Sequence, residues 1–198
     1  MTAEPRTATT ADVERLSAAL AAAFHDDPVW SWLLPNARRR PPRLRRFFDI
    51  ELRHLALVHG SVWVPPDLTG ASLAMPPGHW RMPVSVTVAR SPGFVRVLGA
   101  RLPIALGLLT RMEWRHLREP HYYFPYIGVT PAAQGRGLGS RLMRPTLERC
   151  DAEGLPAYLE ATNARNVALY ERLGFEGIDD LTFAGSPPLR LMVRRPQA

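Results

Sequence analysis

The chain has 198 residues, of which 46% are hydrophobic and 22% charged, a composition typical of one globular domain with a substantial core. Its formal net charge is +7 and every basic residue is arginine, which favours an anionic partner such as a phosphorylated cofactor. One cysteine, Cys150, excludes an internal disulfide and argues against a zinc cluster. The N-terminus lacks a signal-peptide profile, and the most apolar stretch, 102–110, is too short to span a bilayer. We therefore expect a cytoplasmic protein with no metal and no membrane partner.

The first two thirds of the chain predict helices and short strands in alternation. In chain order we expect a strand at 6–8, helices over 13–24 and 38–59, strands at 61–66 and 71–77, a helical segment over 84–117, and a strand ending at Val129. Thr9, Thr10 and Asp12 offer caps for the first helix, and Gly60 is a stop signal for the second.

The last third carries the clearest pattern. A glycine-rich turn after Val129 leads into a helix from Leu138 to about Ala152, which Gly154 stops although Pro145 interrupts it. A strand at 157–161, a helix over 164–175 with Gly174 as C-cap, and a closing strand at 189–195 follow. This rhythm predicts a mixed α/β layer.

The turn QGRGLG holds three glycines in six residues, directly before a helix. Helix N-termini bind phosphate through unpaired N–H groups, and glycine lets an anionic ligand approach the backbone closely. The dinucleotide fingerprint requires G-x-G-x-x-G and the P-loop requires a lysine, so neither pattern fits. A plain connecting turn is the alternative, but three glycines favour a ligand.

The spacing Gln134-Gly-Arg-Gly137-Leu-Gly139 resembles Q/R-x-x-G-x-G/A, the acyl-CoA pyrophosphate loop of the GNAT acetyltransferase superfamily. YIGVTP upstream resembles the fourth strand of that family, and NVALYERLGF downstream resembles its final motif. Within the superfamily, these motifs look most similar to puromycin N-acetyltransferase and its relatives. The resemblance is strong over roughly the last eighty residues and weaker before them.

This resemblance implies a single GNAT domain over 1–198, with a mixed central sheet splayed between strands four and five, helices on both faces, and a helical insertion at about 84–118 over the acceptor side. Acetyl-CoA is the implied co-substrate, and its acetyl group passes directly to an amine. The residues implied to bind it are Ile127, Gly128, Val129, Gln134, Gly135, Arg136, Gly137, Leu138, Gly139, Ser140, Asn166 and Tyr170. A strand bulge around Ile127–Val129 is expected to open the splay.

The resemblance assigns Tyr170 as the acid that protonates the leaving thiolate. Asn166 and Tyr170 are four residues apart, hence on one helix face, although packing is the alternative for an aromatic there. Glu160, on the same strand face as Tyr158, is the candidate general base; equally, it can anchor a loop or recognise a cationic substrate. His121 is a reserve base, and the other histidines are expected to be structural or exposed.

Three alternatives stay open. The stretch 37–46 has six arginines in ten residues, but it opens an amphipathic helix, so a solvated face is favoured over nucleic-acid binding. A CoA-binding regulatory domain without activity and an enzyme acting on protein or peptide amines are the other two. We expect an N-acetyltransferase for a small-molecule primary amine, with no nucleic-acid partner and with a homodimer left open.

Overall fold

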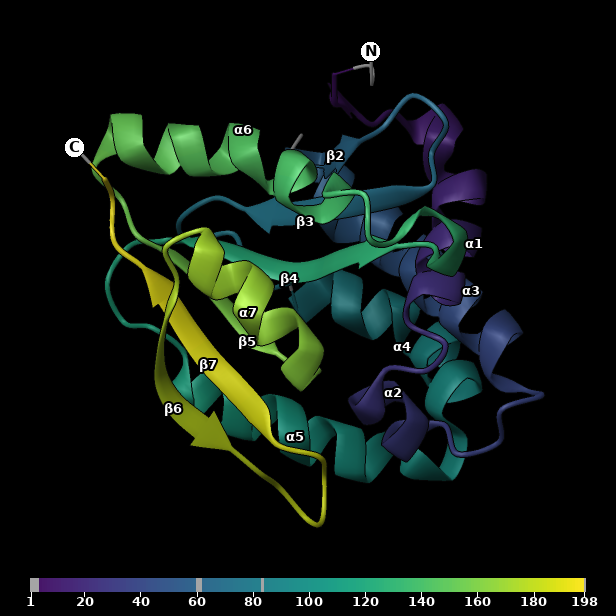
Figure 1. The fold of residues 1–198 in the computed structure, drawn as a ribbon. Coiled ribbons are helices and arrows are strands. Elements are labelled where there is room, and N and C mark those ends of the chain that lie inside the picture. The colour runs from purple at the N-terminus through teal and green to yellow at the C-terminus, as the bar shows by residue number, and fades with distance from the viewer. Residues whose placement is uncertain (1–3, 60–61, 83, 198) are drawn as a thin grey trace.

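The computed structural model describes residues 4–59, 62–82 and 84–197, so the proposed stop at Gly60 lies outside the described residues. These residues form one mixed sheet in the order β1-β2-β3-β4-β5-β7-β6 (Figure 1). Its strands are β1 (Arg6–Thr7), β2 (Val62–Val64), β3 (Gly70–Met75), β4 (Tyr122–Val129), β5 (Ala157–Ala161), β6 (Glu176–Leu181) and β7 (Leu189–Arg194). β4 and β5 pair in parallel, and the other neighbours pair antiparallel.

Helices cover both faces of this sheet, which confirms the predicted fold class (Figure 1). One face packs on α1 (Val13–Ala23), α2 (Pro28–Leu33), α3 (Arg40–Glu51), α4 (Val84–Leu98) and α5 (Leu102–Arg115). The other packs on α6 (Leu138–Glu153) and α7 (Ala164–Arg172). We call these the α1 face and the α6 face. Single turns complete the chain: η1 (Thr10–Asp12), η2 (Leu52–Ala56, a π turn), η3 (Leu57–His59), η4 (Gly99–Arg101) and η5 (Pro131–Ala133).

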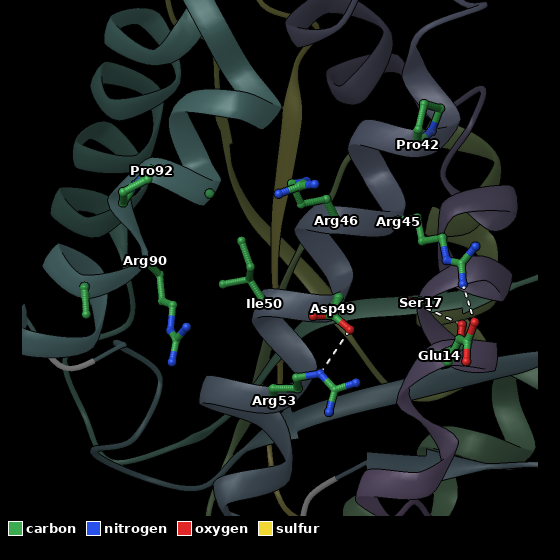
Figure 2. A pocket seen from close by; sticks show the side chains of 12 residues that line it. Glu14, Ser17, Pro42, Arg45, Arg46, Asp49, Ile50, Arg53, Arg90 and Pro92 are labelled. Carbon is green, nitrogen blue, oxygen red and sulfur yellow. Dashed lines mark hydrogen bonds and ion pairs between the residues drawn. The ribbon is translucent and has the colours of Figure 1, made fainter.

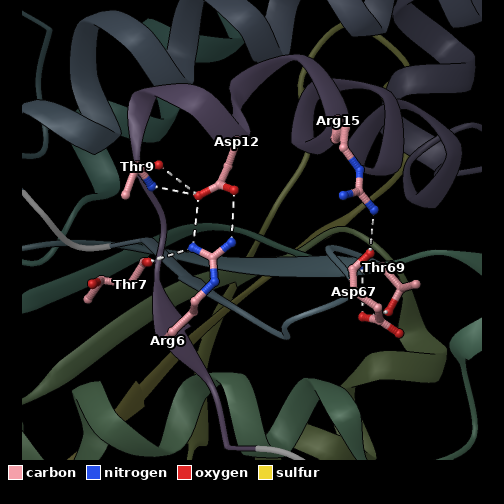
Figure 3. Close-up of polar contacts among 7 residues, drawn as sticks. All are labelled: Arg6, Thr7, Thr9, Asp12, Arg15, Asp67 and Thr69. Atoms are coloured by element: carbon pink, nitrogen blue, oxygen red, sulfur yellow. Dashed lines mark hydrogen bonds and ion pairs between the residues drawn. The ribbon is translucent and has the colours of Figure 1, made fainter.

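The first strand is tied to the first helix by an ion pair between Arg6 and Asp12 (Figure 3). Two nitrogens of Arg6 each donate to one oxygen of Asp12 at 2.8 Å, and the main-chain N–H of Thr9 donates to the same carboxylate at 2.8 Å. Arg15 donates to the main-chain oxygen of Asp67, in the turn between β2 and β3, at 3.1 Å. These contacts fix α1 against the sheet edge.

The predicted helical segment over 84–117 forms α4 and α5, which leave several apolar side chains in solvent. The exposed set is Val88, Val95, Leu106, Leu109 and Trp114. The helical run Ser85–Arg115 is long and apolar enough to cross a membrane by length and composition, and 17% of its most apolar window is buried in the protein. The inner side packs on the domain, since Phe94 contacts Phe47 with ring centroids 6.3 Å apart.

Two local features differ from the sequence expectation. β6 was not predicted, because EGIDDL has no apolar alternation; antiparallel pairing with β7 holds it as an edge strand. Arg40, expected on a solvated helix face, is only 5% exposed. Its side chain donates to the main-chain oxygens of Leu34 and His25 at 2.8 and 2.5 Å, and so caps the preceding loop.

Candidate active site

β4 and β5 pair over only two residues and then separate. Tyr122 pairs with Ala157 and Tyr123 with Tyr158, whereas β5 continues to pair with β7 as far as Ala161. Among the described residues, no later β4 residue pairs with β5, so the β4 edge that faces β5 keeps main-chain groups unpaired. The predicted splay between the fourth and fifth strands is therefore present. We call this opening the β4–β5 gap.

A bulge in β4 lies at the base of the gap. Leu73 and Met75 of β3 pair with Tyr126 and Tyr123, so three residues of β4 match two of β3. The extra residue turns Tyr123 and Tyr126 to the α1 face, while Phe124 packs on the α6 face. The bulge was predicted around Ile127–Val129; it lies instead between Tyr123 and Tyr126, and the chain after it pairs regularly with β3.

Gly128 is required by the packing of α1. A Cβ at this position would lie 2.8 Å from a ring carbon of Phe24 and 3.0 Å from a methyl of Leu20. The atoms that approach Gly128 are side chains, those of Leu20 in α1 and of Phe24 directly after it. Ile127 packs against the α6-face cluster, so the two residues meet opposite layers.

The glycine turn forms an open cradle at the N-terminus of α6. Gly135 and Gly137 have φ of +77° and +69°, a backbone conformation that residues other than glycine rarely adopt. No atom lies within 4 Å of a Cβ built on either glycine. Gln134 folds back and donates to the main-chain oxygen of Val129 at 3.0 Å, while Arg136 is exposed. The main-chain N–H groups of Leu138, Gly139 and Ser140 begin the helix. Bare backbone at a helix N-terminus fits the pyrophosphate of acetyl-CoA.

Tyr170 lies on the α6 face, and its side chain is buried. The residue is 6% exposed and its ring centroid is 6.1 Å from that of Phe175. Burial raises the pKa of its phenol, and the nearby Asp27 raises it further, so the hydroxyl stays protonated at neutral pH. Asn166, one turn earlier on α7, is exposed. The buried Tyr170 and the exposed Asn166 therefore lie on the same helix, α7.

Glu160 lies on the opposite, α1 face, and its side chain is only 3% exposed. Tyr123 donates to its Oε2 at 2.8 Å, and His116 Nδ1 lies 3.6 Å from its Oε1. Within the described chain, Oε1 has no hydrogen-bond partner. The buried Tyr158 hydroxyl lies close to Glu160, but the contact falls short of hydrogen-bond geometry. The predicted pairing of Tyr158 and Glu160 on one strand face is confirmed.

Comparisons with known proteins find similarity to N-acetyltransferases. The Acetyltransferase (GNAT) family pattern matches residues 89–175. An uncharacterised N-acetyltransferase of Schizosaccharomyces pombe is 29% identical over 94% of this chain and 81% of its own length. A solved structure titled for histone acetyltransferase HPA2 and related acetyltransferase, from Corynebacterium glutamicum, has a TM-score of 0.76 at 25% identity, covering 100% of this chain and 98% of its own. These likenesses indicate that the chain is an acetyl-CoA-dependent acyltransferase.

A mycothiol acetyltransferase of Mycobacteroides abscessus is also similar, at 35% identity over 57% of this chain. The chain spans 35% of that relative's length, so the likeness concerns part of it only. The finer resemblance to puromycin N-acetyltransferases rests on the motif sequences alone.

Sequence reasoning missed a histidine of this acetyltransferase site. His116, expected to be structural or exposed, is 5% exposed and lies between Glu160 and His121. It follows α5 and precedes β4, so no motif marks it. A usable signal was the alternation of His121 with Tyr123 on a strand beside Tyr158 and Glu160. Asp27 caps α2 by accepting from the N–H groups of Val29 and Trp30.

A separate groove of about 690 Å³ opens between α1, α3 and α4, away from the β4–β5 gap (Figure 2). Its walls carry arginines of α3 and α4. Figure 2 shows Arg45 paired with Glu14 at 2.9 Å and Arg53 paired with Asp49 at 3.0 Å. Carboxylates thus neutralise two of these arginines, which is typical of a solvated, ion-paired helix surface.

Proposed function

We propose that this acetyltransferase moves the acetyl group of acetyl-CoA directly to a primary amine of a small molecule, within the β4–β5 gap. The observation that carries the proposal is the placement of Tyr170 and Glu160. Both belong to elements beside the gap, Tyr170 on the α6 face and Glu160 on the α1 face. A thioester entering from the α6 face and an amine entering from the α1 face meet between an acid and a base.

The coenzyme is held by the α6 face. We infer that the N–H groups from Gly135 to Ser140 bind its pyrophosphate, with Gln134 shaping the loop and Arg136 adding positive charge. Asn166 is suited to bind the amides of the pantetheine arm. Within Ile127–Val129, the main-chain N–H groups that point away from β3 are suited to polarise the thioester carbonyl.

The transfer forms an N–C bond and breaks the C–S bond, whose electron pair leaves on sulfur. Glu160 removes a proton from the attacking amine, and Tyr170 donates a proton to the departing thiolate. Burial supports the role of Tyr170, because a phenol with a raised pKa remains a donor at neutral pH. In net terms, a cationic amine and acetyl-CoA yield the amide, CoA thiol and one released proton; Glu160 then loses the proton that it took, and Tyr170 regains one from solvent.

The cover over the α1 face supports a small acceptor. α4 lies against α3 so closely that a Cβ on Gly93 would be 2.7 Å from Ile50, and α5 lies so close to Phe183 that a Cβ on Gly107 would be 2.5 Å from its ring. Such a roof suits an enclosed amine better than a folded protein surface. The names of the relatives do not decide between the two kinds of acceptor, since one names mycothiol and another names histone.

Release of CoA thiol from acetyl-CoA, measured against a panel of monoamines, diamines, aromatic amines, puromycin and a peptide, tests this proposal. We expect turnover with at least one small amine and its loss in Glu160→Gln. Turnover of the peptide alone would overturn the small-molecule acceptor. Tight CoA binding without thiol release for any amine of the panel would favour a non-catalytic CoA-binding domain instead.

A further inference from the structure

Three buried side chains form a row that leads away from the β4–β5 gap. His116 Nδ1 lies 3.6 Å from Glu160 Oε1, and His116 Nε2 lies 3.0 Å from His121 Nε2. At the far end, His121 Nδ1 lies 2.7 Å from the main-chain oxygen of Glu119. The two histidines are 5% and 4% exposed. The indole of Trp80 stacks on the His116 ring at 3.9 Å, which holds the ring in this orientation.

The far end fixes which nitrogens carry protons. A carbonyl oxygen only accepts, so His121 Nδ1 must be the donor to Glu119. In neutral His121, the Nε2 atom is then an acceptor, and the facing His116 Nε2 must donate to it. Neutral His116 consequently presents the lone pair of Nδ1 to Glu160 Oε1.

This arrangement leaves one proton missing between Glu160 and His116. A carboxylate oxygen and an unprotonated imidazole nitrogen repel each other, which matches the 3.6 Å separation and the unpartnered Oε1. One added proton satisfies the contacts along the row, whether it rests on Glu160, on His116 or, after both histidines shift their protons, on His121.

We propose that Glu160, His116 and His121 act as a single proton acceptor, in which the proton taken from the amine by Glu160 passes to the two histidines. This inference rests on the proposed function of Glu160 as the base. The proton moves from the amine nitrogen to Glu160 Oε1 and on to His116 Nδ1, while His116 Nε2–H moves to His121 Nε2. No bond other than those to hydrogen changes, and Glu160 is again a carboxylate.

The groups around the row favour its proton-accepting state at neutral pH. Burial lowers the pKa of His121, and the neighbouring His116 lowers it further, so His121 is neutral before the amine arrives. Tyr123 and Tyr158 pack on the row from β4 and β5, and burial raises the pKa of both phenols, which therefore stay neutral. Among the described residues, the charge of Glu119 acts on His121, and the charge of Arg115 in α5 acts on the neighbouring Tyr158.

Imidazole nitrogen NMR of the ligand-free protein gives a first test that needs no acceptor. We expect His121 as the Nδ1–H tautomer and His116 as the Nε2–H tautomer at neutral pH, each distinguished by its ¹⁵N shifts. In Glu160→Gln the side-chain amide can donate to His116 Nδ1, so both tautomers should persist. The opposite tautomers in the wild-type protein would overturn the proposal.

Kinetics of His116→Gln give the second test. At a pH low enough for the wild-type row to hold its extra proton already, the row cannot accept another, whereas the variant lacks this block. The wild-type to variant ratio of kcat/KM should therefore fall as pH falls from 8 to 5, starting from about tenfold or more at pH 8. A ratio that is constant with pH indicates a merely structural histidine and overturns the inference.

A control separates this failure from failure of the proposed function. His54 faces Arg90, Asp49 and Arg53 beside the groove, and His54→Gln should keep the wild-type pH profile. Loss of activity in Glu160→Gln together with a constant His116 ratio leaves the proposed function in place and removes only the proton row. Full activity of Glu160→Gln would overturn both the proposed role of Glu160 as the base and the proton row.

Discussion

The Tyr123 hydroxyl donates a 2.8 Å hydrogen bond to Glu160 Oε2, and this bond joins β4 to β5 at the residue where their main-chain pairing ends. Tyr123 is the last β4 residue that pairs with β5 among those described, and Glu160 lies two residues beyond its partner Tyr158. A side-chain bond thus continues the strand contact just before the gap opens. It also supplies the neutral donor that a buried carboxylate needs.

Removing this donor should cost stability. Tyr123→Phe leaves a carboxylate oxygen buried without its partner, so we expect the free energy of unfolding to fall by about 1–3 kcal/mol in urea denaturation. Tyr122→Phe is the matched control, because its hydroxyl donates to the more exposed Glu153 at 2.9 Å on the other face. Equal losses in the two variants would contradict the importance of burial.

Tyr170→Phe should separate catalysis from binding. The substitution keeps the ring beside Phe175 and removes the hydroxyl that would donate the proton, so kcat should fall by about 10²-fold or more. The dissociation constant for CoA, measured by calorimetry, should stay within about twofold. Parallel losses of kcat and CoA affinity would assign Tyr170 to packing or binding.

The two ends of α6 offer a matched pair of glycines. Gly137 at the N-terminus has φ of +69° and Gly154 at the C-terminus has φ of +67°, and a Cβ on either meets no atom within 4 Å. Alanine at each position should therefore cost a similar backbone strain, about 1–2 kcal/mol in unfolding free energy. Only Gly137→Ala should weaken CoA binding, by about tenfold or more in calorimetry. Equal CoA affinities in the two variants would show that this loop does not bind the pyrophosphate.

The predictability of the fold follows the strength of local signals. β5, α6 and α7 were anticipated because glycine caps, apolar periodicity and a recognisable loop agree over the same residues. β6 was missed because three acidic residues and Gly177 disfavour a strand, and only the hydrogen bonds to β7 form it. Local propensity does not show whether a segment pairs with a strand from another part of the chain.

The candidate site divides in the same way. Glu160 and Tyr170 were found because each lies inside a motif, whereas His116 lies 44 residues before Glu160 and meets it only because β4 and β5 pair in parallel. Gly128 shows a second limit. The need for glycine there comes from the packing of Leu20 and Phe24, which only the folded structure reveals.

The Arg6–Asp12 pair predicts a stability that depends on pH. Hydrogen bonds from Arg6 first, and from Thr9 next, hold the pKa of Asp12 well below its usual value (Figure 3). A depressed folded pKa means that the stabilisation is present above the unfolded value, about 3.9, and is lost as pH falls below it. Asp12→Asn should therefore lower the free energy of unfolding by about 1 kcal/mol at pH 7, a modest value because the Arg6 side chain is 43% exposed. In urea denaturation, the difference in free energy of unfolding between the wild type and Asp12→Asn should shrink between pH 5 and pH 2. A difference that does not change with pH would mean that protonation of Asp12 leaves its contribution to stability intact, and would assign the effect to packing.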